Sequence, residues 1–127
     1  MTQTGAIRIL IVDDHEIIRR GLKMRFAVEP DMSVVGEADD GDTALEQARL
    51  LQPDVVLMDV LMPKMSGITA THHMTTISPT SAVILLSLSD EDQMRRMAMD
   101  AGASVFMTKH SQTDPLIRAV RQLVADR

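Results

Sequence analysis

The chain has 127 residues, the length of one compact domain, and a chain of this size buries somewhat under about 70% of the surface that its unfolded form exposes. Apolar residues make up 45% and charged residues 24%, which excludes a disordered chain, and no apolar run approaches the roughly 18 residues of a membrane span. The formal net charge of -5 opposes nucleic-acid binding by this domain, and the absence of cysteine excludes disulfides, zinc-thiolate sites and thiol catalysis.

The first predicted element is a strand over residues 7–12, which form a short, almost unbroken run of apolar and β-branched side chains. This run ends abruptly at the polar stretch Asp13-Asp14-His15. Ile18, Leu22 and Phe26 then recur at a spacing of four residues, which predicts an amphipathic helix. An acidic turn therefore joins the first strand to the first helix.

The second and third units repeat this alternation. Their predicted elements are a weaker strand over residues 33–38, an acidic turn over 39–42, a helix over 43–51 and an apolar strand over 54–58. Asp42 is the expected N-cap of the helix. The apolar strand ends in Asp59, and a loop with Pro63 and Gly67 follows it.

Two further strand and helix pairs complete the series. They are a strand over residues 82–86, a helix with Met94, Met97, Ala98 and Ala101 on one face, a strand over 104–108, and a helix with Leu116, Val120, Leu123 and Val124. Gly102 is expected to end the first of these helices, and Pro115 lies near the first turn of the second. Ser87 follows the fourth strand and Lys109 the fifth.

Five such units, with several strands apolar on both faces, predict an α/β fold in which helices cover both sides of a parallel sheet. Right-handed crossovers favour the flavodoxin-like (βα)5 fold with strand order 2-1-3-4-5. In this fold, ligands bind outside the carboxyl ends of strands 1 and 3. Those two ends carry Asp13, Asp14 and Asp59.

Three converging carboxylates repel one another unless a cation lies between them. Their oxygen ligands fit Mg²⁺ or Mn²⁺, whose coordination shells leave room for water and phosphate oxygens. Lys109 would reach the same edge and pair with Asp59 or with phosphate, and the Ser87 hydroxyl could bind a phosphoryl oxygen. Taken singly, Asp14 is equally compatible with a helix cap or a solvated rim. Lys109 alone is more typical of a surface lysine, and Ser87 alone of a loop residue or a cap, so the combination carries the prediction.

Over almost its whole length the sequence resembles the receiver domains of two-component response regulators. The motifs that carry this resemblance are Val12-Asp13-Asp14-His15, Leu57-Met58-Asp59-Val60-Leu61-Met62-Pro63, Ser66-Gly67, Ser87, Ala101-Gly102-Ala103 and Lys109. The resemblance implies that Asp59 is the phosphorylated nucleophile and that Asp13, Asp14, Asp59 and the backbone carbonyl of Leu61 hold Mg²⁺. It also implies that Lys109 contacts the phosphoryl group, that Ser87 is the switch hydroxyl and that Phe106 is a mobile aromatic side chain.

His15, the stretch Val-Val-Gly-Glu-Ala over residues 34–38, and a Lys109 without a following proline are most similar to the LuxR-type, nitrate-regulator-like branch. That branch implies transcriptional control through a helix-turn-helix domain. No such domain lies within residues 1–127, so we expect a single receiver domain that is part of a longer regulator or acts alone through protein contacts. A sensor histidine kinase or a phosphotransfer protein is the expected partner.

The same resemblance implies a phosphoacceptor rather than a turnover enzyme. We expect a cytoplasmic protein without membrane attachment, because no apolar run is long enough and no signal pattern is present. A homodimer that phosphorylation strengthens is a further expectation, because Ile117, Val120 and Val124 offer apolar positions on the last helix.

Three alternatives compete with this interpretation. A haloacid-dehalogenase-like phosphatase needs a second aspartate where Leu61 stands. A flavodoxin-like FMN carrier needs a cradle rich in glycine or serine after the first strand, and the chain has no Trp or Tyr to flank the flavin. A receiver fold that signals without phosphate is disfavoured by the complete set of acidic, hydroxyl and lysine residues.

The residues after Lys109 carry a separate expectation. A cis peptide bond before a residue other than proline costs roughly 3 kcal/mol, so the Lys109-His110 bond is expected to be trans. We further expect His110 to face solvent without a catalytic role, and Ser111 or Thr113 to cap the last helix.

Overall fold

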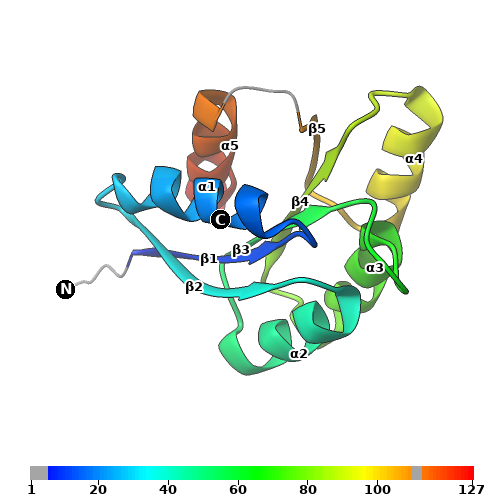
Figure 1. Cartoon of the computed structure of the whole chain (residues 1–127), viewed down its shortest axis with the longest axis horizontal. Coiled ribbons are helices and arrows are strands. Elements are labelled where there is room, and N and C mark those ends of the chain that lie inside the picture. Colours follow the sequence, from blue (N-terminus) through cyan, green and yellow to red (C-terminus); the bar gives the residue numbers. More distant parts are fainter. Residues whose placement is uncertain (1–5, 110–112) are drawn as a thin grey trace.

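Strands and helices alternate along the whole chain, as the sequence predicts. The computed structural model describes residues 6–109 and 113–127 (Figure 1). Its elements are β1 (Ile7–Val12), α1 (Glu16–Ala27), β2 (Met32–Ala38), α2 (Gly41–Leu51), β3 (Val55–Asp59), α3 (Gly67–Ile77), β4 (Ala82–Ser87), α4 (Asp92–Ala101), β5 (Val105–Thr108) and α5 (Thr113–Ala125). Helix α3 is the one helix for which the sequence analysis named no residues, although five strand and helix units imply it.

The five strands form one parallel sheet in the order β2-β1-β3-β4-β5, which confirms the flavodoxin-like prediction. Strand β1 therefore lies between β2 and β3, and the chain changes direction across the sheet at the β1–β3 pair. The polar turns that follow β1 and β3 consequently lie side by side at the carboxyl edge.

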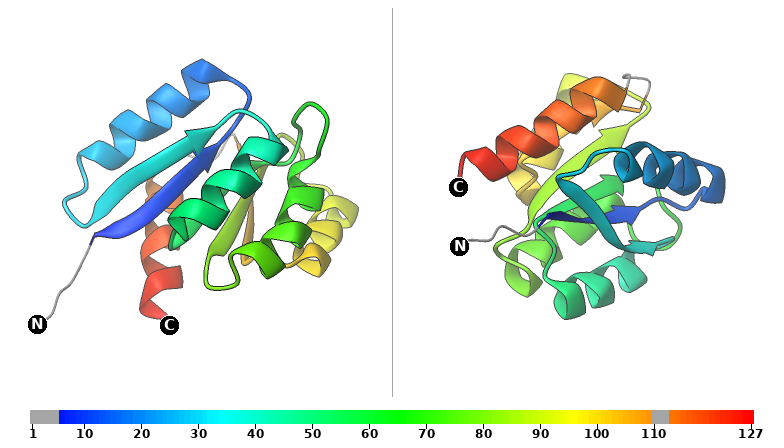
Figure 2. Two further views of the ribbon diagram at one scale, coloured as in Figure 1. Left: turned by 90° about the horizontal axis from the view of Figure 1, so that it is seen from below. Right: turned by 90° about the vertical axis from the view of Figure 1, so that its left-hand side faces the viewer.

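Helices cover both faces of the sheet, with α1 and α5 on one side and α2, α3 and α4 on the other (Figures 1 and 2). Successive side chains of a strand point to opposite faces, so Ile9 and Ile11 pack toward α1 and α5. Leu10 and Val12 pack toward the opposite helices. This double burial explains why the strand has no polar face.

Two helix ends test the expected caps. The N-cap of α2 is Asp40, whose carboxylate accepts the Thr43 N–H at 2.8 Å, so the expected cap at Asp42 is wrong. With this cap the helix begins at Gly41, two residues earlier than predicted. Gly41 fits closely against Met65, where a β-carbon would lie only 2.8 Å from the methionine side chain. Gly102 ends α4 with a positive φ of 114°, as expected.

The packing of the last helix removes the reason given for expecting a dimer. Ile117 and Val120 are buried against β1, β3 and β4, and Val124 packs against the same cluster. These positions therefore belong to the core of the domain and do not form a free apolar surface for self-association.

Among the described residues, no helix is both long and apolar enough to cross a membrane. The expectations for His110, for the Lys109-His110 bond and for a cap at Ser111 lie outside the described residues, as does the side chain of Thr113.

Candidate functional site

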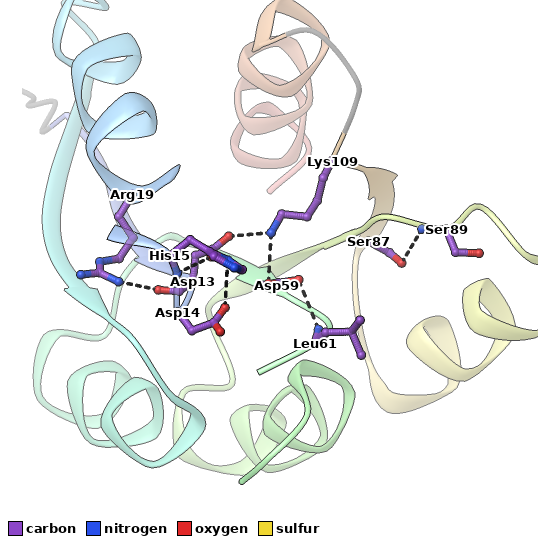
Figure 3. Close-up of polar contacts among 9 residues, drawn as sticks. All are labelled: Asp13, Asp14, His15, Arg19, Asp59, Leu61, Ser87, Ser89 and Lys109. Carbon is purple, nitrogen blue, oxygen red and sulfur yellow. Dashed lines mark hydrogen bonds and ion pairs between the residues drawn. The ribbon is translucent and has the colours of Figure 1, made fainter. Parts of the chain in front are cut away.

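The acidic side chains that follow β1 and β3 come together at the carboxyl edge of the sheet (Figure 3). One ligand atom from each of Asp13, Asp14, His15 and Asp59 lies within 4.8 Å of the others. Asp13 and Asp59 are almost fully buried, whereas Asp14 and His15 lie toward the mouth of the site. The structure therefore brings together the three carboxylates that the sequence predicts.

Lys109 enters this acidic group from the end of β5. Its Nζ lies 2.9 Å from Asp13 Oδ2 and 3.1 Å from Asp59 Oδ2, as Figure 3 shows. Its backbone N–H donates to the Ser87 carbonyl at 2.7 Å, which keeps the end of β5 beside β4. The ammonium thus bridges the ends of two neighbouring strands, and one oxygen of each carboxylate does not contact it.

Burial sets the electrostatics of the site. Desolvation raises the pKa of Asp59 above its ordinary value, because it outweighs the hydrogen bond and the charge of Lys109. Desolvation acts in the opposite direction on the ammonium, yet the hydrogen bonds to Asp13 and Asp59 outweigh it and raise the pKa of Lys109. Lys109 therefore stays protonated beside a carboxylate that is costly to keep charged.

Backbone hydrogen bonds hold the loops that carry the acids. The Asp13 N–H donates to Ala38, and its carbonyl accepts from Arg19 Nη1 at 2.7 Å. After Asp59, the Val60 N–H donates to Leu86 at 2.9 Å, and the Val60 carbonyl accepts from Gly67 at 2.7 Å. Both acidic turns are thus fixed by contacts with neighbouring elements.

The other predicted site residues are Leu61, Ser87 and Phe106. The Leu61 N–H donates to Asp59 Oδ1 at 3.2 Å, while its side chain is exposed. The Ser87 hydroxyl is buried and accepts the Ser89 N–H at 3.1 Å, and Figure 3 shows it turned toward Ser89. Phe106 is also buried and lies on the side of α4.

Comparison with known families identifies the family of this chain. Residues 9–121 match the model of the response regulator receiver domain. The chain belongs to this family. It is a receiver domain of the two-component response regulators, and the resemblance stated from the motifs is confirmed.

Similar proteins place this receiver in the LuxR-type branch. It is 40% identical to the response regulator GacA of Pseudomonas aeruginosa over 94% of this chain and 56% of that protein. It is 32% identical to the nitrate/nitrite response regulator NarL of Escherichia coli over 98% of this chain and 58% of that protein. The receiver thus spans little more than half the length of these curated relatives.

Solved structures agree with the fold. The receiver domain of a NarL regulator from Mycobacterium tuberculosis has a TM-score of 0.92 at 32% identity, with 98% of this chain and all of that chain covered. A LuxR-family regulator from Aurantimonas has a TM-score of 0.90 at 32% identity, with 97% and 88% covered.

One residue that lies at this receiver site was not placed there from the sequence. His15 was interpreted from the sequence only as a marker of the branch, yet its Nδ1 lies 3.0 Å from Asp13 Oδ1 and 3.1 Å from Asp14 Oδ1. A histidine directly after an acidic pair was the available signal. Its direction could not be predicted, because it depends on how the chain turns from β1 into α1.

Proposed function

We propose that this receiver accepts a phosphoryl group on Asp59, from the phosphohistidine of a sensor kinase or phosphotransfer protein or from a small acyl phosphate. A carboxylate oxygen of Asp59 forms the new bond to phosphorus as the bond to the donor nitrogen or oxygen breaks, and the donor keeps the electron pair. Water later cleaves the acyl phosphate and restores the carboxylate. The single observation that supports this proposal most strongly is the buried Asp59 carboxylate, held by Lys109 beside a second acidic strand end.

The residues at the site fit a divalent cation. Asp13 and Asp14 face Asp59, and Asp14 Oδ1 is buried with no hydrogen-bond partner in the described part of the chain. We propose that these carboxylates and the Leu61 carbonyl hold Mg²⁺, with Mn²⁺ as a substitute. When bound, the cation neutralises charge on the transferred oxygens. Lys109, whose ammonium contacts Oδ2 of both Asp13 and Asp59, would supply a second positive charge beside the transferred phosphoryl group.

Phosphorylation would act on the rest of the domain through Ser87 and Phe106. A phosphoryl oxygen offers the Ser87 hydroxyl a stronger acceptor than any that it meets now, since an anionic acceptor strengthens a hydrogen bond. Turning toward it would remove the acceptor of the Ser89 N–H. The resemblance to receiver domains implies that Phe106 then turns toward the vacated space. The surface formed by α4, β5 and α5 would then favour a second arrangement and a different partner or oligomer.

For the whole protein we propose transcriptional control by a DNA-binding domain outside residues 1–127, which form the receiver alone. The similarity to GacA and NarL supports this output, and the net charge of -5 opposes DNA contact by the receiver itself. We propose that the receiver acts in the cytoplasm as a phosphoacceptor that loses its own phosphoryl group, rather than as a turnover enzyme.

The direct test is labelling with acetyl phosphate and Mg²⁺, followed by intact mass measurement. Wild type and the control Asp42→Asn, a charge change at an exposed position, should gain one labile phosphoryl group. Asp59→Asn should gain none, and EDTA should abolish labelling of the wild type. Equal labelling of Asp59→Asn, or labelling that survives EDTA, would sink the assignment.

A further inference from the structure

His15 is the one side chain of the acidic group that the proposed function leaves unused. It occupies the N-cap position of α1, but its side chain makes no capping hydrogen bond there. The imidazole instead turns back over the acidic turn, as Figure 3 shows, although 64% of the side chain is exposed to solvent. Helix capping therefore does not explain the orientation of this ring.

The polar contacts of the ring have the spacing of ligand atoms in a coordination shell. His15 Nδ1 makes a hydrogen bond of 3.0 Å with Asp13 Oδ1 and lies 3.1 Å from Asp14 Oδ1. In an octahedral shell with bonds of about 2.1 Å, adjacent ligand atoms lie about 3.0 Å apart. The His15 N–H also donates to Asp13 Oδ1 at 2.8 Å, so the backbone fixes the imidazole relative to the carboxylate.

The two oxygens concerned are those that Lys109 does not contact. Lys109 contacts Oδ2 of Asp13, which leaves Oδ1 on the side of the imidazole. Asp14 Oδ1 is buried and has no hydrogen-bond partner among the residues that the structure describes. A cation between these oxygens and His15 Nδ1 would give Asp14 Oδ1, which accepts no hydrogen bond from the described residues but lies 3.1 Å from His15 Nδ1, a positive partner. It would also use a neutral nitrogen donor in place of a water molecule.

We propose that His15 is a metal ligand of this receiver and that its imidazole shifts the preference of the acidic site from Mg²⁺ toward a divalent transition metal. This inference rests on the proposed metal site. Mg²⁺ prefers a shell of oxygen ligands, whereas imidazole nitrogen suits Ni²⁺, Zn²⁺, Fe²⁺ and Cu²⁺. An imidazole added to the carboxylates should therefore raise the affinity for these ions more than the affinity for Mg²⁺.

The test compares two metals on variants that keep the fold. His15→Asn removes the ring but keeps a residue that is well suited to an N-cap, so α1 should still form. His73→Asn is the matched control, because it replaces another exposed histidine on α3, away from the acidic site. Dissociation constants for Ni²⁺ and Mg²⁺ are measured by calorimetry, and Mn²⁺-loaded samples are examined by electron spin-echo spectroscopy for a directly bound nitrogen.

His15→Asn should weaken Ni²⁺ binding at least about tenfold, since removing even an indirect partner of a metal ligand typically costs that much, and should change Mg²⁺ binding less than about twofold. The nitrogen coupling to Mn²⁺ should be present in wild type and in His73→Asn and absent in His15→Asn. Equal weakening of both metals would show that His15 only orients Asp13 and would overturn the assignment. Unchanged Ni²⁺ affinity would overturn it as well.

Labelling of Asp59 by acetyl phosphate and Mg²⁺ is followed on the same samples. A His15→Asn variant that labels like wild type and binds Ni²⁺ like wild type defeats the His15 assignment while the proposed function stands. Failure of wild type to label defeats the proposed function, and in that case the Ni²⁺ constants and the nitrogen coupling still decide whether His15 is a ligand.

Discussion

Replacement of Gly67 by alanine should damage both the fold and the site, because this glycine lies against the backbone of Asp59, the proposed phosphoacceptor. A β-carbon at Gly67 would come within 2.1 Å of the Asp59 carbonyl oxygen and 3.0 Å of Val60 Cα. These neighbours are backbone atoms, which cannot rotate away as a flexible side chain can. The Gly67 N–H also donates to the Val60 carbonyl, so the helix cannot withdraw without losing that hydrogen bond.

The geometry gives the size of the effect. Ordinary van der Waals contact begins at 3.4 Å, so the new methyl group and the Asp59 carbonyl must separate by about 1.3 Å. Overpacking of this kind costs about 1 to 3 kcal/mol or more, and we expect a value near the upper end. A displacement of about 1 Å at a reacting group can lower a rate about 100-fold, so labelling of Asp59 should slow by about 10- to 100-fold.

Gly21→Ala is the matched control for this experiment. Gly21 lies inside α1, and a β-carbon there meets nothing within 4 Å. Alanine should therefore stabilise the domain by about 0.5 to 1 kcal/mol through helix propensity alone. Urea unfolding gives the two free energies, and timed labelling with acetyl phosphate gives the rates. The steric reasoning fails if Gly67→Ala unfolds at the wild-type urea concentration and labels at the wild-type rate.

Three further predictions concern the site, the core and the surface. Lys109→Ala should stay folded but lose the change in amide spectra that beryllofluoride and Mg²⁺ cause in wild type; a wild-type response would refute its role. Met74→Ala should cost about 2 to 5 kcal/mol in urea unfolding because this side chain is fully buried, whereas exposed Met24→Ala should cost little, and equal losses would contradict the packing. Arg121 holds the pKa of Asp31 below its ordinary value, so their pairing stabilises the fold fully above that ordinary value and less as the pH falls through the lowered one. Arg121→Gln should therefore lose stability relative to wild type at neutral pH, and this loss should shrink as the pH falls through the lowered pKa of Asp31. A loss independent of pH would refute the pairing.

The sheet and the position of the acidic group could be predicted because both depend on local patterns. The strand over residues 7–12 is apolar on both faces, and only a parallel sheet covered on two sides buries such a strand. Once the strand order follows from right-handed crossovers, Asp13 and Asp59 must end on neighbouring strands. No knowledge of side-chain contacts was required for that step.

The details that the sequence could not provide depend on contacts between distant segments. The start of α2 depends on the cap that the Asp40 carboxylate forms with the Thr43 N–H, and Gly41 at this start packs closely against Met65, which is distant along the chain. The sequence did not indicate α3 because its residues, including Thr69, His72 and His73, do not form a clear pattern of apolar and polar faces. The burial of Ile117 was missed because an apolar stripe on a helix does not show how wide a face the sheet will cover.

The contacts beyond the acidic group indicate how a change at Asp59 could reach the surface. Ser87 uses its carbonyl to hold Lys109 and its hydroxyl to hold Ser89, so one residue ties the end of β5 and the loop before α4 to the same strand end. Phe106 lies beside Leu85 in the sheet. The guanidinium of Arg95 lies 5.0 Å from the centroid of the Phe106 ring and donates a hydrogen bond to the Phe106 carbonyl.

In the proposed switch, the Ser87 hydroxyl turns to a phosphoryl oxygen and frees the Ser89 N–H at one end of the loop before α4. Arg95 would transmit any movement of the Phe106 ring to α4, because the same guanidinium contacts both the ring and its backbone. Helix α4 is therefore the element whose position should respond first to phosphorylation, whereas α5 is held to the other face by its buried side chains.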